Sequence, residues 1–311
     1  MKKNPGLFKR IKNETAYLGI RTVIGLFRML PRKAALGLSS MLGRVAPFLA
    51  RKDYSRAVEN LTAAFGNDRD KHEIRKLARE TFRHLAMNFT DAARLAVMSP
   101  EQIKNICVPH NMDRLKENLA KGRGVIGLTS HTGCWELLGV YLATVGIPIA
   151  VIARRMHDTR LEKMLVETRL RGGMKNISRG HNTRDVIRAL KDGYLLGVLI
   201  DQDTNIKGEF VEFFGKSAHT ATAPALLSLK YDVPIIPVLT YRDKSHRHHV
   251  CIGEPVEINA TGDRDNDVLE LTAQCSKTIE RFVNEHHEQW VWFHRRWKTK
   301  KTVEKSKNAK T

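Results

Sequence analysis

The stretch GRGVIGLTSHTGCWELLGVYLATVG, residues 122–146, decides the fold class. Residues 122–130 form a short apolar run typical of a buried strand, and residues 135–146 have the pattern of a helix. Strands that alternate with helices predict an α/β fold with a central mixed, largely parallel sheet flanked by helices. Further strands are expected at 148–154, 194–201, 234–242 and 248–258, and further helices at 159–172, 183–193, 221–232 and 266–288.

The residues before this region predict helices only, at 16–31, 34–49, 55–65 and 71–97. In the first of them Arg21, Gly25 and Arg28 form a narrow cationic stripe beside a wide apolar face, which is typical of a helix lying in a membrane interface. The alternative is a helix that packs on the body of the protein. We therefore expect three parts: a basic, amphipathic membrane-associating extension (1–50), an α/β domain (51–298), and a basic disordered tail (299–311).

The net charge of +20 is concentrated at the two ends of the chain. Residues 1–60 contain 13 Lys and Arg against 3 acids, and residues 294–311 contain 8 against 1, so only +3 remains for the central body. Basic ends suit an anionic membrane surface, an acidic protein or nucleic acid. Nucleic acid is not expected as a partner, because the charge does not follow a stripe interleaved with aromatic residues.

Other features of the sequence argue against several classes of protein. No apolar run reaches the roughly 18 residues that a membrane-spanning helix needs, and no signal peptide is expected at the start. The four cysteines are widely spaced without a C-x-x-C pattern, which indicates a reducing compartment and neither a disulfide framework nor a zinc ribbon.

His131 is the first candidate for catalysis, because it directly follows the strand at 122–130. Ligands of open α/β sheets bind beyond the carboxyl ends of the strands. Glu136 falls in the first turn of the next helix, where its carboxylate can hold the imidazole and stabilise its protonated form. The alternative is a His131 that only caps this helix, with Glu136 favoured there by the helix dipole.

Two further positions near this site carry reactive side chains. Cys134 is either a nucleophile with His131 as its base or a small apolar filler, and its bulky apolar neighbours favour the filler. Asp201 and Asp203 close the strand at 194–201, where they can bind a divalent cation, cap a loop or pair with an arginine.

Basic side chains elsewhere have similar alternatives. Arg169 and Arg171 can hold an oxyanion or a phosphate, or they belong to a solvated helix face. His246, His248 and His249 alternate along an exposed strand, but no matching ligand cluster accompanies them, so we expect no metal site.

Five segments in this order resemble the lipid A biosynthesis acyltransferases, the late lauroyl and myristoyl transferases of Gram-negative bacteria. Their signature of His, four residues and Asp or Glu belongs to a wider superfamily of lysophospholipid acyltransferase-like enzymes. The resemblance covers about residues 15 to 300, and it departs at Cys134, where relatives often carry asparagine. The segments are RAVENLTAAFG (56–66), HTGCWE (131–136), RLRGGMKNISR (169–179), residues 199–238, and EQWVWFHRRWKT (288–299).

This resemblance implies the transfer of a fatty acyl chain from an acyl carrier protein thioester, or from acyl-CoA, to a hydroxyl of a membrane glycolipid. A lipid A precursor is the first candidate for this acceptor. The resemblance also implies a peripheral or monotopic enzyme on the cytoplasmic face of the inner membrane, with no metal and no tightly bound cofactor. The alternatives are an O-acyltransferase of glycerolipids, lysophospholipids or other glycolipids and, outside enzymes, a basic protein that binds nucleic acid or a membrane.

Within this interpretation, His131 deprotonates the acceptor hydroxyl and Glu136 orients the imidazole, without a covalent acyl-enzyme. The family's functionally important arginine falls on Arg169, which we expect to stabilise the oxyanion or to bind acceptor phosphate. The matching acid of the later segment is Asp201, which we expect to fix Arg169 or another basic residue.

Overall fold

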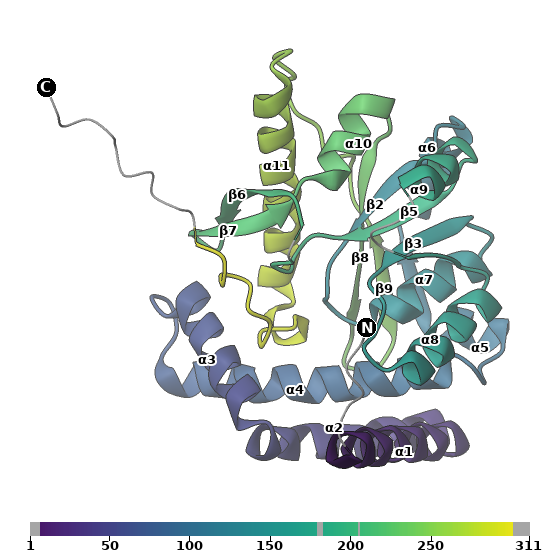
Figure 1. Ribbon diagram of the computed structural model, residues 1–311, viewed down its shortest axis with the longest axis vertical. Helices are drawn as coiled ribbons and strands as arrows, with labels where there is room; N and C mark the ends of the chain where they lie inside the picture. Colours follow the sequence, from purple (N-terminus) through teal and green to yellow (C-terminus); the bar gives the residue numbers. More distant parts are fainter. Residues whose placement is uncertain (1–6, 179–182, 205, 301–311) are drawn as a thin grey trace, which may run out of the picture.

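The computed structural model describes residues 7–178, 183–204 and 206–300, so most of the predicted C-terminal tail lies outside the described residues (Figure 1). Its central sheet has seven strands in the order β1-β9-β8-β2-β5-β3-β4. Only the β8–β9 pair is antiparallel, which confirms the expected mixed, largely parallel sheet. The strands are β1 Cys107–His110, β2 Val125–Thr129, β3 Ile149–Ala153, β4 Lys175–Ser178, β5 Leu195–Leu199, β8 Ile235–Arg242 and β9 His248–Ile252.

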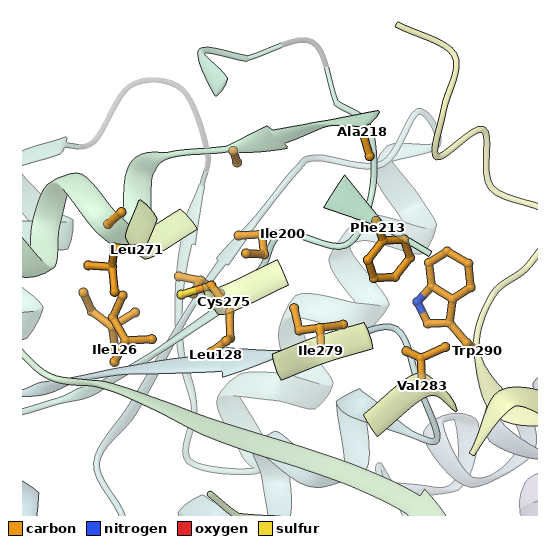
Figure 2. Close-up of a cluster of buried hydrophobic side chains, with 14 of the residues drawn as sticks. Ile126, Leu128, Ile200, Phe213, Ala218, Leu271, Cys275, Ile279, Val283 and Trp290 are labelled. Atoms are coloured by element: carbon orange, nitrogen blue, oxygen red, sulfur yellow. The ribbon is translucent and has the colours of Figure 1, made fainter. Parts of the chain in front are cut away.

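The continuous apolar runs form strands because both faces of the sheet are covered. On β2, Ile126 and Leu128 point into one hydrophobic cluster, and Val125 points into a second cluster across the sheet. Figure 2 shows the first cluster, in which Ile126 and Leu128 face Cys275 of α11. The helices beside the sheet are α5 Pro100–Asn105, α6 Met112–Ala120, α7 Trp135–Thr144, α8 Thr159–Arg171, α9 Thr183–Lys191, α10 Ala223–Tyr231 and α11 Arg264–Glu285.

The first four helices of the chain form a layer at the bottom of Figure 1. Asp70 starts the long fourth helix with a capping box that includes Glu73. The second helix packs closely on it at Gly43, where an added Cβ would lie 2.7 Å from the Cα of Arg83. These helices are α1 Leu7–Met29, α2 Arg32–Leu49, α3 Arg51–Phe65 and α4 Lys71–Arg94.

The first helix packs on the body of the protein along one face, and its association with a membrane stays a prediction. Ile24 and Phe27 are buried against the protein, while Leu18, Val23 and Leu26 remain exposed. No helix in the described part of the chain is long and apolar enough to cross a membrane.

Several elements differ from the sequence prediction. The expected strand at 248–258 ends at Ile252, and Pro255 beyond it has no N–H for a sheet hydrogen bond. The helix expected at 71–97 ends at Arg94, and the last helix ends at Glu285 before a 3₁₀ turn at His287–Gln289. The short elements β1, β4, α5 and α6 were not predicted, nor was the antiparallel hairpin of β6 Gly208–Phe213 and β7 Lys216–Ala221.

Candidate active site

The sheet brings His131 and Asp201 together. β2 and β5 are parallel neighbours, and Thr129 pairs with Leu199 at their carboxyl ends. His131 and Asp201 each lie two residues beyond this last pair, so they leave the sheet side by side. This is the edge at which ligands bind in open α/β sheets.

Asp201 holds His131 through two hydrogen bonds. Its Oδ1 lies 2.8 Å from the imidazole Nδ1, and its Oδ2 accepts from the backbone N–H of His131 at 2.6 Å. Burial by itself would raise the pKa of this carboxyl group, but the charge and hydrogen bonds of His131 lower it to about 2. Asp201 is therefore a carboxylate throughout the neutral pH range.

The ionised carboxylate fixes the tautomer of the imidazole. A carboxylate only accepts hydrogen bonds, so the Nδ1 of His131 carries the proton of this contact. The Nε2 of a neutral ring then has a free lone pair. Because the side chain of His131 is 20% exposed, unlike the fully buried Asp201, the ring is accessible as a general base.

The expected contact between Glu136 and His131 is wrong. Glu136 instead accepts two hydrogen bonds from Arg169, from Nε at 2.9 Å and from Nη2 at 2.5 Å. Burial alone would lower the pKa of Arg169, but the carboxylate of Glu136 more than offsets this effect and the pKa is raised. The remaining Nη1 donates to Asn176 at 2.8 Å.

Asp201 was expected to fix Arg169 or another basic residue, and the structure shows the second alternative, because the basic residue that it contacts is His131. The His131–Asp201 and Glu136–Arg169 pairs both result from the backbone conformation after β2. The residues from His131 to Cys134 are not helical, and α7 begins only at Trp135, so Glu136 does not lie one helical turn from His131.

The loop that carries His131 is held at Gly133. This glycine has a φ of +60°, and an added Cβ would lie 2.5 Å from the carbonyl oxygen of Thr240. The side chain of Asn88 on α4 donates to the carbonyl of Gly133 at 2.7 Å. Thr132 forms an isolated antiparallel bridge with Trp290, so the loop is fixed from two sides.

A buried polar network that sequence reasoning missed supports this loop. Asp91 on α4 accepts hydrogen bonds from Arg242 on β8 at 2.6 Å and from Arg32 on α2 at 2.8 Å, and the ring of His248 lies 2.8 Å from it. Arg242 also donates to Asn88 at 2.8 Å. The network thus connects the N-terminal helices, the sheet and the His131 loop. No spacing in the sequence indicates it, because its members come from four separate elements.

The structure favours the apolar filler as the role of Cys134. Its side chain is buried, and burial raises the pKa of its thiol to about 12, so almost no thiolate exists near neutral pH. Its Sγ lies 3.4 Å from the backbone carbonyl of Asn88, to which the thiol donates. His131 therefore remains the candidate for the reactive group of this loop.

The candidate cation ligands are engaged by the protein itself. Both oxygens of Asp201 accept hydrogen bonds, and Asp203 accepts from the backbone and the hydroxyl of Thr299 at 2.8 and 3.0 Å. The three histidines of the 246–249 segment do not converge either, since His248 contacts Asp91 and His249 contacts Asp243. Among residues 7–178, 183–204 and 206–300, no group of three or more His, Cys, Asp or Glu could hold a metal ion.

An apolar cavity of about 420 Å³ lies beside the His131 loop. The indole of Trp135 lines this cavity and also contacts the imidazole of His131, with the ring centroids 4.9 Å apart. The Glu136–Arg169 pair forms part of its polar wall. The apolar walls come from α1, α4, α7, the β3–α8 segment and α8, with Ile20, Ile24, Leu85, Phe89, Val140, Met156, Leu161, Met164 and Leu165 among their residues.

The profile of the bacterial lipid A biosynthesis acyltransferase family matches residues 2–299 of this chain. The chain is 27% identical to the lipid A biosynthesis palmitoleoyltransferase of Escherichia coli K12 over 91% of each chain. It is 26% identical to lipid A biosynthesis acyltransferase 2 of Shigella flexneri, covering 85% of this chain and 83% of the relative. It is also 27% identical to the phosphatidylinositol mannoside acyltransferase of Mycolicibacterium smegmatis, over 68% and 70% of the two chains.

The match covers both the helical N-terminal layer and the sheet, and it includes His131, Glu136, Arg169 and Asp201. The relatives of the chain are named acyltransferases. The chain therefore belongs to the family of bacterial lipid A biosynthesis acyltransferases and is an O-acyltransferase.

Proposed function

We propose that this enzyme transfers a fatty acyl chain from a thioester to a hydroxyl of a lipid A-like glycolipid at a membrane surface. The observation that carries the proposal is the His131–Asp201 pair beside an apolar cavity, with Trp135 in contact with both. A general base next to a space for a hydrocarbon chain is the arrangement that O-acylation by a fatty thioester requires.

In this mechanism the Nε2 of His131 takes the proton of the acceptor hydroxyl. The oxygen attacks the thioester carbonyl carbon, a C–O bond forms and the C–S bond breaks. The departing thiolate takes the proton back from the imidazolium, so His131 returns to its starting state and no acyl-enzyme forms. Asp201 keeps the proton on Nδ1 and stabilises the imidazolium, as the third group of a catalytic triad does.

The cavity of about 420 Å³ is the proposed site for the acyl chain. Its walls are mainly apolar, so a hydrocarbon chain that enters it gains about 0.8 kcal/mol for each buried CH₂. Ile20 and Ile24 of the N-terminal helix belong to these walls. The first helix thus contributes to the acyl-binding site as well as to the surface layer.

Negative charge that develops on the thioester oxygen needs a positive environment. The N-terminus of α7 begins four residues after His131, and its first N–H groups have no partner within the helix. Arg169 remains our candidate for the oxyanion or for acceptor phosphate, although three of its N–H groups are engaged by Glu136 and Asn176. We propose that the Glu136–Arg169 ion pair also stabilises the walls of the cavity, since it joins the first turn of α7 to the last turn of α8.

We propose that α1 and α2 place the enzyme on the membrane. Met29, Phe48 and Leu49 have the largest exposed fractions among the exposed large hydrophobic residues of the described chain, 87%, 69% and 85%, and an exposed apolar surface of this kind suits contact with lipid. The basic residues of the first 60 positions add attraction to anionic lipid, about 1 kcal/mol for each well-placed Lys or Arg. The proposed location is the cytoplasmic face of the inner membrane, where the same positive field would also attract an acidic acyl carrier protein.

Mass spectrometry of total lipid A and glycerophospholipids tests this function. Cells would carry the wild-type protein, no protein, His131→Ala, or His72→Ala as the matched control, because His72 is an exposed histidine on α4. We expect one acyl chain of lipid A to be missing without the protein and with His131→Ala only. Normal acylation by the expressed His131→Ala protein would contradict the mechanism.

The same experiment identifies the acceptor. The similarity to a phosphatidylinositol mannoside acyltransferase makes another glycolipid the second candidate. If lipid A is unchanged and another glycolipid loses a chain, acyl transfer stands and the acceptor is different. Loss from a glycerophospholipid would instead support the lysophospholipid alternative.

A further inference from the structure

Asp201 has a third hydrogen-bond donor. The indole Nε1 of Trp290 donates to Oδ2 of Asp201 at 2.8 Å, and this oxygen also accepts from the backbone of His131. Among the described residues, Trp290 is the only donor to Asp201 apart from His131 itself. The orientation of the carboxylate therefore depends on one side chain from the C-terminal segment, far from Asp201 in the sequence.

Trp290 is itself held in a fixed position. Its side chain is 1% exposed and lies beside Phe213 and Trp292, with ring centroids 5.5 and 4.7 Å away. Figure 2 shows its indole beside Phe213, above Val283 of α11. The backbone bridge to Thr132 joins the same residue to the loop that carries His131.

The segment that follows Trp290 is anchored at several points. Asn60 of α3 donates to the carbonyl of Trp292 at 2.6 Å. The buried Arg296 donates to the carbonyl of His219 and to the hydroxyl of Thr220, both at 2.6 Å. Thr299 then reaches Asp203, two residues beyond Asp201. Both acids of the Asp201–Asp203 segment thus receive donors from residues 290–299.

We propose that Trp290 is a positioning residue for the acyl transfer, which acts through Asp201 on the imidazole of His131. The indole N–H keeps Oδ2 in place, so that Oδ1 faces Nδ1 of His131. It also withdraws charge from the carboxylate. This inference rests on the proposed function of His131 as the general base.

The test replaces Trp290 by β-(3-benzothienyl)alanine, which keeps the bicyclic shape but has sulfur in place of the N–H. Trp292 offers a matched control, because it is equally buried and its Nε1 donates only to the backbone carbonyl of His287 at 2.5 Å. The full chain, incorporated in vesicles, would be assayed with a fatty acyl thioester and a lipid A-like acceptor. The measurements are kcat, both KM values and the pH–rate profile.

For the Trp290 isostere we expect kcat to fall about tenfold with little change in KM, since a hydrogen bond to a charged group is lost. The acid limb of the pH–rate profile should move to higher pH. Without the indole N–H, the carboxylate of Asp201 carries more negative charge and stabilises the protonated imidazole of His131 more strongly. The Trp292 isostere should keep the wild-type profile. Equal kinetics of the two isosteres, or an unchanged profile for Trp290, would overturn the inference.

A spectroscopic measurement covers the case in which the Trp290 isostere does not fold. The chain has four tryptophans, and their indole ¹H–¹⁵N resonances can be compared between the wild type and Asp201→Asn. One of the four resonances should move upfield when the charged acceptor is removed. If none moves, Trp290 does not bond to Asp201 in solution and the proposal fails.

The two hypotheses fail in different ways. Turnover by His131→Ala would overturn the proposed function itself. An inactive His131→Ala together with a Trp290 isostere that behaves like the Trp292 control would overturn only the role of Trp290.

Discussion

His131 and Asp201 occupy the same position on neighbouring parallel strands, each two residues beyond the last pair Thr129 and Leu199, and their side chains meet at 2.8 Å. The contact between base and orienting acid is therefore set by the register of the sheet. A shift of one strand by one residue would turn one of the two side chains to the other face.

Removal of the charge of Asp201 should cost most of the activity. Asp201→Asn keeps the shape but no longer fixes the proton on Nδ1, so we expect kcat to fall by about 10²–10⁴-fold. The double variant with His131→Ala should be no worse than His131→Ala alone, because both residues act as one unit. Asp243→Asn is the matched control, since Asp243 contacts His249 in a second Asp–His pair away from the site. A full loss in the control would point to a general effect on folding.

The same carboxylate should make stability depend on pH in the acid range. The pKa of Asp201 is lowered to about 2 in the folded protein, below its usual value in an unfolded chain, so its stabilising contribution is complete above the unfolded pKa. It is lost as the pH falls from about 5 towards 2, and amounts to about 2 kcal/mol. Urea unfolding of the wild type and Asp201→Asn across this range should show a difference that shrinks as the pH falls. A constant difference would contradict the shifted pKa.

The Glu136–Arg169 pair should be important for stability. Only 14% of the Glu136 side chain and 11% of the Arg169 side chain are exposed. Glu136→Ala leaves Arg169 unpaired and should lower the free energy of unfolding by about 3 kcal/mol, whereas Glu136→Leu with Arg169→Met should recover much of this loss. The exposed pair of Arg123 and Asp232 is the control, with an expected change of at most about 1 kcal/mol. If the apolar double variant is stable but inactive, the pair also contributes to chemistry.

The size of the cavity should affect the preferred acyl chain. Ala92 of α4 lines the cavity, and Ala92→Leu would fill part of its volume. We expect the preferred donor to become shorter when turnover is compared across thioesters of different chain length. Ala63→Leu, a similarly half-buried alanine on α3 outside the cavity, should keep the original preference. An unchanged preference in Ala92→Leu would place the acyl chain elsewhere.

The exposed apolar side chains of α2 should hold the enzyme on lipid. Phe48→Glu with Leu49→Glu adds charge to the proposed contact surface, so we expect more protein in the soluble fraction and weaker binding to anionic vesicles. Leu269→Glu on α11, where the leucine is 39% exposed, is the control and should bind as the wild type does. Equal vesicle binding by the wild type, the Phe48→Glu, Leu49→Glu double variant and the Leu269→Glu control would contradict the role of α2.

The sequence predicts the parts of the fold in which local pattern and burial agree. The runs that become β2, β3, β5 and β8 are apolar because helices cover both faces of the sheet. The β6–β7 hairpin and the four-residue strands β1 and β4 were missed, since they are short and partly polar.

For the site, the sequence indicated the residues but not their partners. The spacing of His131 and Glu136 suggests a contact only if the chain between them is helical, and the positive φ of Gly133 breaks that condition. A usable signal was present, because His131 and Asp201 lie at equal offsets from Gly127 and Gly197, which pair in the sheet. Trp290 gives no such signal, since its approach to Asp201 depends on the path of the whole C-terminal segment.

The buried carboxylate of Asp91 has a practical consequence for anyone who purifies this enzyme. Arg32 of α2 supplies one of its cationic partners. Deletion of the first two helices to avoid detergent would therefore remove that partner and expose the face of α4 on which these helices pack. A detergent-free preparation is better obtained by replacing exposed apolar residues of α2 with polar ones. Such a protein would keep Arg32, the packing at Gly43 and the wall that α1 provides for the cavity.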